Sequence, residues 1–190
     1  MDREHEAERD ERTLVERART DAEAFAELYR RYLPRVHAFA YRRTGSVEVA
    51  EDVTAASFER AWRSLGSFSW RAGGFGPWLF RIVSNELVDH YRRTARAGSD
   101  RARGAAAALH PGGPGDPGEA LDERESTAEV LAAMSTLSPR YQRALSLRYL
   151  SGLTLDEAAA AMGTSRATMA VIVHRATRAL RRALSMEAPR

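Results

Sequence analysis

The residues from 64 to 76 combine four glycines with three aromatic side chains, Phe68, Trp70 and Phe75. Aromatic rings offer stacking surfaces to unpaired bases, worth about 1–3 kcal/mol per base, and arginine guanidinium groups follow the phosphates. Four arginines lie within this segment or after it: Arg71, Arg81, Arg92 and Arg93. The composition therefore predicts a surface that binds single-stranded nucleic acid.

A base that leaves its stack needs a pocket with polar groups that read its edge. Suitable side chains nearby are Ser67, Ser69 and Asn85. We expect Phe68, Trp70 and Asn85 to face such a ligand. Other large aromatic residues are expected in the core, because most aromatic side chains are buried. They are Trp62, Phe75 and Trp78.

Residues 153–179 predict a second nucleic-acid site, built on two short helices. Thr154 and Glu157 have the spacing of a capping box, and Gly163 suits the end of that helix. Ser165 can cap the next helix. Two helices joined by a turn of this length form a helix-turn-helix, whose second helix enters the major groove of DNA. An ordinary helical hairpin is the alternative.

The second helix of this motif has an apolar face and a basic one. Met169, Val173 and Ala176 recur at helical spacing, and no carboxylate occurs between residues 162 and 185. On a wheel of about 100° per residue, Val171 points away from the apolar face and Ile172 lies at its edge. The residues expected to meet duplex DNA are Ser165, Arg166, Thr168, Val171, His174, Arg175 and Arg178.

The composition favours binding over catalysis. The 190 residues carry 29 basic side chains, all arginine, against 26 acidic ones. Arginine suits phosphate because its planar guanidinium donates hydrogen bonds in pairs. The chain has no cysteine and its five histidines lack metal-site spacing, so we expect neither disulfides nor a bound metal. No phosphate-binding glycine motif and no serine nucleophile elbow occur, so no catalytic residue and no cofactor are expected.

The hydrophobic pattern predicts an all-α chain of two small helical domains joined by a flexible Gly/Pro-rich linker, the C-terminal one a helix-turn-helix. Residues 1–12 carry six acidic and three basic side chains and are expected to form a disordered leader. The first domain is placed at 13–94, the linker at 95–121 and the second domain at 122–185. No apolar run is long enough to cross a bilayer, which predicts a cytoplasmic protein without membrane insertion.

Local signals place the helices of the first domain. Asp21 and Ser46 are suited to cap two of them, and Gly45 to end the first. Pro34 is expected to break or kink the first helix, because proline lacks the backbone N–H. A third helix is expected over residues 77–93.

The segments FAELYRRYLPRV (25–36), AEDVT (50–54), FERAW (58–62) and WLFRIVSN (78–85) stand in this order ahead of the helix-turn-helix. Together with that motif they resemble the extracytoplasmic-function sigma factors of bacterial RNA polymerase. The resemblance implies that the first domain docks on the clamp of core RNA polymerase and captures the single-stranded minus-ten element. The second domain would read the minus-thirty-five element as duplex promoter DNA and touch the polymerase flap. An anti-sigma factor is implied as a further partner.

The same resemblance assigns roles to residues of the first domain. Residues 67–71 match the loop that reads the minus-ten bases, and Asn85 matches the residue beneath the base pocket. The positions that match the clamp-docking helix are Glu51, Asp52, Ala55, Ala56, Glu59 and Trp62.

Two positions depart from the family pattern. Many relatives carry Gln-Glu, which faces the clamp, where this chain has Ala55 and Ala56. Relatives often carry Lys-Ser-Arg where this chain has Ala-Val-Ile at 170–172. An outward valine can meet thymine methyl groups or pack on a protein. We therefore expect a less polar base readout, or a recognition helix that another protein surface covers.

Two other functions stay open. A stand-alone helix-turn-helix regulator would bind duplex DNA itself, but it needs dimer symmetry or an effector domain, and we see neither in the sequence. It would also have no use for the aromatic segment. An adaptor that binds polymerase without reading a promoter is the other, weaker alternative, and the two departures keep it open.

Overall fold

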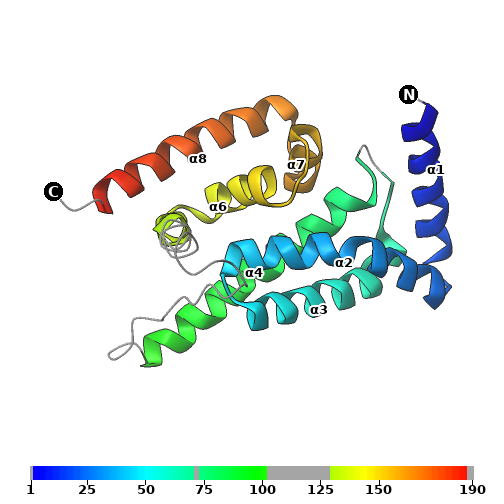
Figure 1. The fold of residues 1–190 in the computed structure, drawn as a ribbon, viewed down its shortest axis with the longest axis horizontal. Coiled ribbons are helices and arrows are strands. Elements are labelled where there is room, and N and C mark those ends of the chain that lie inside the picture. Colours follow the sequence, from blue (N-terminus) through cyan, green and yellow to red (C-terminus); the bar gives the residue numbers. More distant parts are fainter. Residues whose placement is uncertain (1, 71–72, 102–128, 188–190) are drawn as a thin grey trace, which may run out of the picture.

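The computed structural model describes residues 2–70, 73–101 and 129–187, and this part of the chain is helical, with no strand (Figure 1). Its elements are α1 (Asp2–Arg17), α2 (Ala22–Thr44), α3 (Val47–Ser64), the 3-10 turn η1 (Leu65–Ser67), α4 (Phe75–Arg101), α6 (Pro139–Leu145), the π-helical turn η2 (Ser146–Leu150), α7 (Leu155–Met162) and α8 (Arg166–Glu187). Residues 129–135 are also helical. The predicted all-α class is confirmed.

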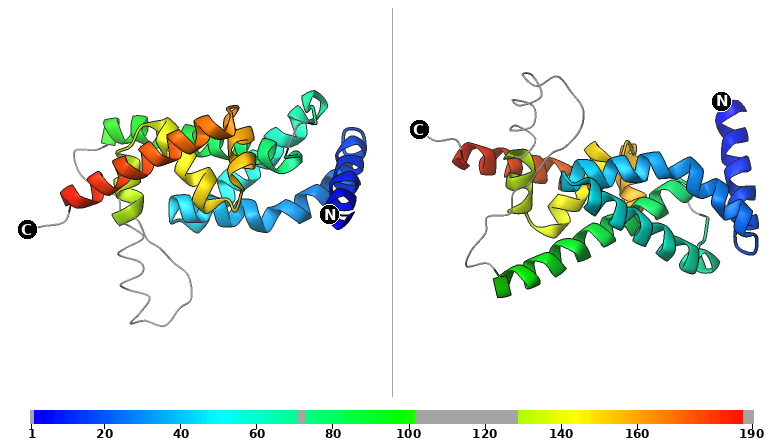
Figure 2. Two further views of the ribbon diagram at one scale, coloured as in Figure 1. Left: turned by 90° about the horizontal axis from the view of Figure 1, so that it is seen from above. Right: turned by 60° about the horizontal axis from the view of Figure 1, so that its bottom comes forward.

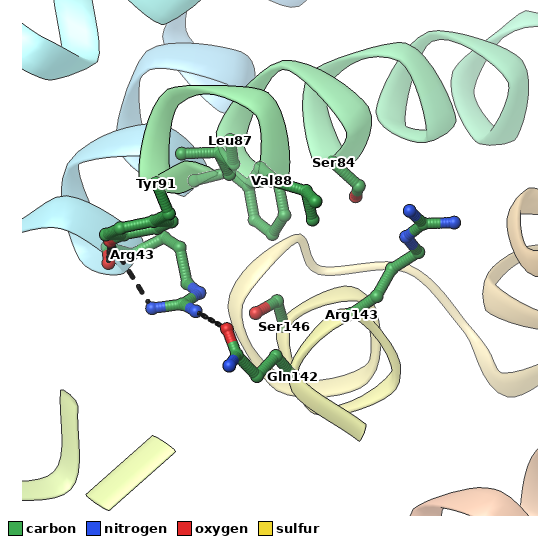
Figure 3. Close-up of a pocket in the computed structure, with 9 residues that line it drawn as sticks. Arg43, Ser84, Leu87, Val88, Tyr91, Gln142, Arg143 and Ser146 are labelled. Atoms are coloured by element: carbon green, nitrogen blue, oxygen red, sulfur yellow. Dashed lines mark hydrogen bonds between the residues drawn. The ribbon is translucent and has the colours of Figure 1, made fainter. Parts of the chain in front are cut away.

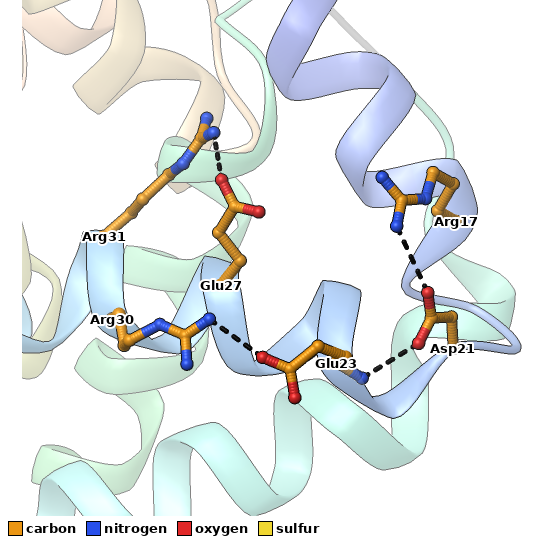
Figure 4. A network of polar contacts seen from close by, with 6 residues as sticks. All are labelled: Arg17, Asp21, Glu23, Glu27, Arg30 and Arg31. Carbon is orange, nitrogen blue, oxygen red and sulfur yellow. Dashed lines mark hydrogen bonds and ion pairs between the residues drawn. The ribbon is translucent and has the colours of Figure 1, made fainter.

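Local sequence signals set the ends of α2 and α3. The Asp21 carboxylate caps α2 by accepting a hydrogen bond from the Glu23 amide at 2.9 Å (Figure 4). The helix ends at Gly45, whose φ of 67° is a left-handed conformation that glycine adopts readily. The Ser46 hydroxyl then caps α3 by accepting from the Val49 amide at 3.3 Å. The predicted caps and helix end are confirmed.

The N-terminal segment is a helix, so the prediction of a disordered leader over residues 1–12 is wrong for the described residues 2–12. Leu14 and Val15 of this helix are buried in the core. Asp10 forms an ion pair with Arg31 of α2 at 3.1 Å. The polar composition was misleading because apolar residues just after position 12 anchor the helix and α2 provides partners for its charges.

Helix α2 runs unbroken through Pro34, so the predicted break is wrong. Residues on both sides of the proline are buried, including Leu28 before it and Val36 and Phe39 after it. A proline in a helix interior costs about 3 kcal/mol, whereas burying a leucine, valine or phenylalanine contributes about 1.5–3 kcal/mol each. Packing along the whole helix therefore outweighs the lost hydrogen bond.

Helices α2, α3 and α4 surround the core of the first unit. Phe39 of α2 and Phe80 of α4 meet edge-on with ring centroids 5.4 Å apart, and both are fully buried. Leu79 and Val83, also fully buried, lie on the same side of α4. Figure 1 shows α4 crossing α2 and α3, which lie side by side. Residues 65–70 follow α3, and residues 73–74 directly precede α4.

Helices α6 to α8 pack against the first unit. Met134, Leu145 and Ala176 form a small core of their own, whereas Leu147 and Met169 join the main core with residues of α2 and α4. Figures 1 and 2 show α7 beside the N-terminal half of α4, and α8 packs on α6 and α7. In this structure the two units share one apolar core.

Helix α4 is longer than predicted, because it continues to Arg101 rather than ending at residue 93. The rest of the predicted linker, residues 102–121, and residues 122–128 of the predicted second domain lie outside the described residues. Within the described part of the chain, no helix is long and apolar enough to cross a membrane.

Candidate nucleic-acid interface

The aromatic loop (residues 65–76) joins α3 to α4 over a cluster of rings. Phe68 is only 5% exposed, and its ring centroid lies 5.0 Å from that of Trp78 and 6.0 Å from that of Phe75. Phe75 is fully buried, as predicted, and Trp78 is half-buried. The expectation that Phe68 lies outside the core is wrong, although Phe68 still lines the groove between this loop and the helix-turn-helix. Its ring packs beneath the loop because the aromatic residues at the start of α4 provide an apolar surface there.

The other residues expected to bind a single strand, where their side chains are described, are exposed or half-buried along the loop and α4: Ser67, Ser69, Trp70, Arg81, Asn85, Arg92 and Arg93. Arg71 lies outside the described residues. The Ser67 hydroxyl donates to the Ser64 carbonyl at 2.8 Å, which leaves its oxygen lone pairs for a ligand. The loop therefore presents hydroxyls and part of an indole ring.

The structure separates the basic residues of α4 into two groups. Arg81 lies near the loop, whereas Arg92 and Arg93 follow three turns later, about 17 Å along the helix axis at 1.5 Å per residue. Arg92 pairs with Asp89 at 3.8 Å, and Arg93 Nε donates to the Asp89 carbonyl at 3.3 Å. A strand held by both groups would have to run along α4.

A groove of about 450 Å³ lies between the aromatic loop and the helix-turn-helix. Ser67, Ser69 and Arg81 line it on one side, and Gly163 and Thr164, in the turn of the helix-turn-helix, line it on the other. The sequence offers no signal that these distant segments meet. In this arrangement the turn of the second unit faces the part of the first unit expected to hold a single strand.

The helix-turn-helix has the predicted geometry. Thr154 and Glu157 form a reciprocal capping box at the start of α7, and Gly163 ends that helix with a φ of 65°. The Ser165 hydroxyl accepts a hydrogen bond from the Thr168 amide at 3.2 Å, which caps α8. These three local predictions are confirmed.

The basic face of α8 is open to solvent. Met169 and Ala176 are fully buried, whereas Val171 is 49% exposed on the opposite face, as the helical wheel predicts. Ile172 was expected at the edge of the apolar face and is buried at 5% exposure. The residues expected to meet duplex DNA are all exposed: Ser165, Arg166, Thr168, Val171, His174, Arg175 and Arg178. Arg166 also forms an ion pair with Asp156 of α7 at 2.5 Å.

The residues expected to dock on the polymerase clamp lie on an accessible face of α3. Glu51, Asp52, Ala55 and Glu59 are exposed, and Ala56 is half-buried. Trp62 is 42% exposed and meets Phe25 edge-on at 4.6 Å, so the expectation that it lies in the core is wrong. It occupies the rim because Phe25 and its neighbours already close the core there.

A polar seam, which sequence reasoning missed, joins α2 and α4 to α6 and η2 (Figure 3). Arg43 Nη2 donates to Gln142 Oε1 at 2.5 Å, and Arg43 Nη1 lies 3.4 Å from the Tyr91 hydroxyl. Burial lowers the pKa of the Arg43 guanidinium and raises that of the Tyr91 hydroxyl. Arg43 looks like an ordinary arginine in the last turn of a helix, so no local signal points to this contact.

Three more polar groups line the seam around a cavity of about 10 Å³, which is room for one water molecule. Ser84 Oγ, Ser146 Oγ and Arg143 Nε are buried there with no partner among the described protein atoms.

Among the described residues, no group of three or more His, Cys, Asp or Glu side chains is arranged to hold a metal ion.

Two protein-family models match the chain. Residues 28–97 match sigma-70 region 2, and residues 127–180 match sigma-70 region 4. Among solved structures, CnrH in complex with the cytosolic domain of CnrY has a similar fold, with a TM-score of 0.65 and 23% identity over 94% of this chain and 99% of that one. The sigma factor RpoE of Bartonella quintana, solved in complex with the anti-sigma factor NepR, is 26% identical, with a TM-score of 0.58 over 86% of this chain and 98% of that one.

Curated relatives agree with these matches. The ECF RNA polymerase sigma factor SigK of Mycobacterium sp. (strain KMS) is 30% identical over 89% of this chain and 87% of its own length. BldN of Streptomyces coelicolor is 34% identical over 92% of this chain, and SigE of Mycolicibacterium smegmatis is 30% identical over 82%. This chain spans 66% of BldN and 59% of SigE. The chain belongs to the extracytoplasmic-function (ECF) family of RNA polymerase sigma factors.

Proposed function

We propose that this chain binds core RNA polymerase and directs it to promoters, reading the minus-ten element as a single strand and the minus-thirty-five element as a duplex. One observation supports this most strongly. The chain carries an exposed basic recognition helix and, separately, a loop that displays hydroxyls and an indole ring beside a groove. A reader of duplex DNA alone has no use for that loop.

We assign residues 13–94 to polymerase and minus-ten binding and residues 122–185 to minus-thirty-five binding, with the linker beginning after α4 ends at Arg101. The strand-binding set in the first unit is Ser67, Ser69, Trp70, Arg71, Arg81, Asn85, Arg92 and Arg93. Phe68, which is 5% exposed and lines the floor of the groove, supports the loop from below. The exposed face of α8 reads the major groove through the residues named above for duplex DNA.

The proposed partners follow from the exposed surfaces and from the relatives. The open face of α3, from Glu51 to Trp62, docks on the polymerase clamp, and the second unit touches the flap. A relative of this chain is solved with an anti-sigma factor, and we infer an anti-sigma partner here as well. The proposed place of action is the cytoplasm, where the polymerase works.

Run-off transcription with purified core polymerase on a fragment from upstream of this gene tests the proposal. We expect a discrete transcript that Trp70→Ala and Asn85→Ala remove. The first change deletes a stacking surface worth about 1–3 kcal/mol, and the second deletes an amide that can read a base edge. Arg30→Ala is the matched control, because Arg30 is an exposed arginine of α2 that pairs only with Glu23 among the described residues. It should leave the transcript unchanged.

The other outcomes separate the alternatives. Stable binding to core without a transcript from this fragment or from a pool of genomic fragments points to an adaptor. Binding to duplex DNA without any affinity for core contradicts the proposal and identifies a stand-alone regulator.

A further inference from the structure

Helix α1 and the turn after it precede residue 28, where the match to sigma-70 region 2 begins. We propose that two residues of this segment, Arg19 and Glu11, are positioning residues that hold the aromatic loop in the shape that receives the minus-ten strand. The proposal rests on the proposed function, because it assigns to α1 a part in single-strand recognition.

Arg19 fixes the first half of the loop. Its Nη2 donates to the carbonyl of Phe68 at 2.8 Å, across 49 positions of sequence. Its Nε pairs with Glu16 of α1 at 3.2 Å, and only 32% of its side chain is exposed. The neighbouring Ala18 is fully buried, so the backbone that carries Arg19 is itself anchored in the core. A guanidinium held in this way presents a fixed hydrogen-bond donor to the loop.

Glu11 fixes the second half of the loop. One carboxylate oxygen accepts from the Tyr32 hydroxyl at 2.5 Å, and the other lies 3.4 Å from the amide of Phe75, the first residue of α4. That amide is one of the backbone donors that a helix start leaves without a partner inside the helix, and a negative charge there is favourable. The carboxylate thus ties the start of α4 to both α1 and α2.

Gly74 shows how closely these groups meet. Its φ is +74°, and a Cβ built on it would lie 2.9 Å from the Glu11 carboxylate and 3.3 Å from the Trp70 ring. Glycine is therefore required here by conformation and by space. The carboxylate of α1 and the indole expected to stack on a base lie on either side of one backbone position.

The consequence is preorganisation of the loop. A segment with four glycines has many conformations available, and a ligand that ordered it would lose affinity to that entropy. Arg19 and Glu11 hold the residues at positions 68 and 75, and the exposed Ser67, Ser69 and half-buried Trp70 project near and between these two points. Neither positioning residue needs to touch DNA.

The test uses the full chain with core polymerase and a labelled oligonucleotide that the wild-type holoenzyme selects from a random twelve-nucleotide single-stranded pool. Loss of one hydrogen bond to a charged group corresponds to about a tenfold or greater loss in binding. We therefore expect Arg19→Ala to bind this probe about tenfold more weakly, with unchanged affinity for core. Arg19→Lys should recover part of the loss, because an ammonium group can donate to the same carbonyl.

Controls isolate the contact to the loop. Arg17→Ala removes a neighbouring exposed arginine of α1 that pairs with Asp21 and has no polar contact with the described residues of the loop, and it should bind the probe like wild type. In a Trp70→Ala background, Arg19→Ala should cause little further loss of binding. If Arg19 acts by placing Trp70, the two losses are not additive. Glu11→Gln, which keeps an oxygen acceptor without the charge, gives an independent variant should Arg19→Ala fold poorly, and we expect a several-fold loss.

The outcomes are distinct. If the wild-type holoenzyme selects no single-stranded sequence, the proposed function itself fails. If it does, and Trp70→Ala weakens binding while Arg19→Ala and Glu11→Gln retain wild-type affinity, the positioning role is wrong. A wider set of sequences selected by Arg19→Ala supports the proposal, because a loop that is held less firmly discriminates less.

Discussion

Arg43 and Gln142, separated by 99 positions in the sequence, meet at 2.5 Å across the seam between the two helical units. Arg43 is only 5% exposed, and no carboxylate pairs with it among the described residues. Ser84, Ser146 and the Nε of Arg143 are buried nearby without a protein partner there. Buried polar groups without partners carry a desolvation cost that hydration relieves. Hydration of these groups therefore offsets part of the cost of separating the two units, whose shared apolar core opposes it.

Gln142→Ala should shift the two units toward an open arrangement. The change removes the Arg43 hydrogen bond, and a hydrogen bond to a charged group contributes about 1.5–3 kcal/mol. Among the described residues, the buried guanidinium would keep the hydroxyl and the ring of Tyr91 as partners, so separation of the units becomes more favourable. Since the natural chain has no cysteine, dyes can be attached through Glu59→Cys and Arg182→Cys, and single-molecule energy transfer reports their separation.

Arg140→Ala provides the control for this measurement, because Arg140 is an exposed residue of the same helix. It should show the wild-type distribution of distances. An unchanged distribution in Gln142→Ala would mean that apolar contacts of Leu147 and Met169 alone hold the units together.

Truncation of two adjacent residues of α8 should change the free energy of unfolding by very different amounts. Ile172 is 5% exposed, so Ile172→Ala should lower the free energy of unfolding by about 2–5 kcal/mol. Val171 is 49% exposed, so Val171→Ala should change it by less than about 0.5 kcal/mol. Urea unfolding measures both.

The effect of Val171→Ala should instead appear in recognition. An exposed valine in the major groove can contact thymine methyl groups, so we expect a changed base preference in duplex selection or weaker binding of a protein partner. Wild-type behaviour in promoter affinity, base preference and anti-sigma binding would show that Val171 has no part in recognition.

Asp21 should make the stability of the chain depend on pH in the acid range. Its pKa is lowered in the folded state, first because the amides of Glu23 and Ala24 donate to the carboxylate and then because Arg17 lies beside it. The folded chain therefore binds this proton less readily than the unfolded chain, whose aspartate pKa is about 3.9. The stabilisation is present above that value and is lost as pH falls through the lower folded pKa.

Asp21→Asn tests this dependence, because asparagine also caps helices well but does not titrate. Thermal unfolding between about pH 2 and pH 6 should show a steeper loss of stability for the wild type on the acid side. Parallel curves for the two proteins would show that the carboxylate contributes nothing through its charge.

The caps show how much of the fold could be predicted from sequence. Each cap bonds to a backbone group only three or four residues away, so a short stretch of sequence is enough to predict it. The examples are Thr154 with Glu157, Gly163 and Ser46. Pro34 does not break its helix, because its cost is local, whereas the packing that outweighs this cost comes from other helices.

The candidate site divides in the same way. The exposed face of α8 follows from one helical period, and the structure places Val171 as the wheel predicts. The burial of Phe68 depends on Trp78, and the support of the loop depends on Arg19, 49 positions away from the carbonyl that it holds. Contacts of this kind leave no periodic or spacing signal, so only the three-dimensional structure shows them.

Asp156 and Arg166 provide a last test, of the basic face itself. Their ion pair at 2.5 Å joins α7 to the first residue of α8, and both side chains are more than half exposed, at 62% and 67%. Exposed pairs contribute about 0–1 kcal/mol to stability, so the pair matters little to folding. The pair does, however, occupy Arg166, the first cation of α8, with a partner inside the protein.

Asp156→Ala should therefore free Arg166 for a phosphate and strengthen duplex binding at low salt. One additional phosphate contact changes the slope of log K against log salt concentration by about −0.9. Fluorescence anisotropy with a labelled duplex that the wild type selects from a random pool, between about 50 and 200 mM salt, measures that slope. Glu23→Ala makes the same change in net charge on α2 and should keep the wild-type slope. If Asp156→Ala and Glu23→Ala show the same slope, any gain in binding comes from the change in net charge, and Arg166 makes no additional phosphate contact. A specific contact of Arg166 would change the slope only when its own partner, Asp156, is removed.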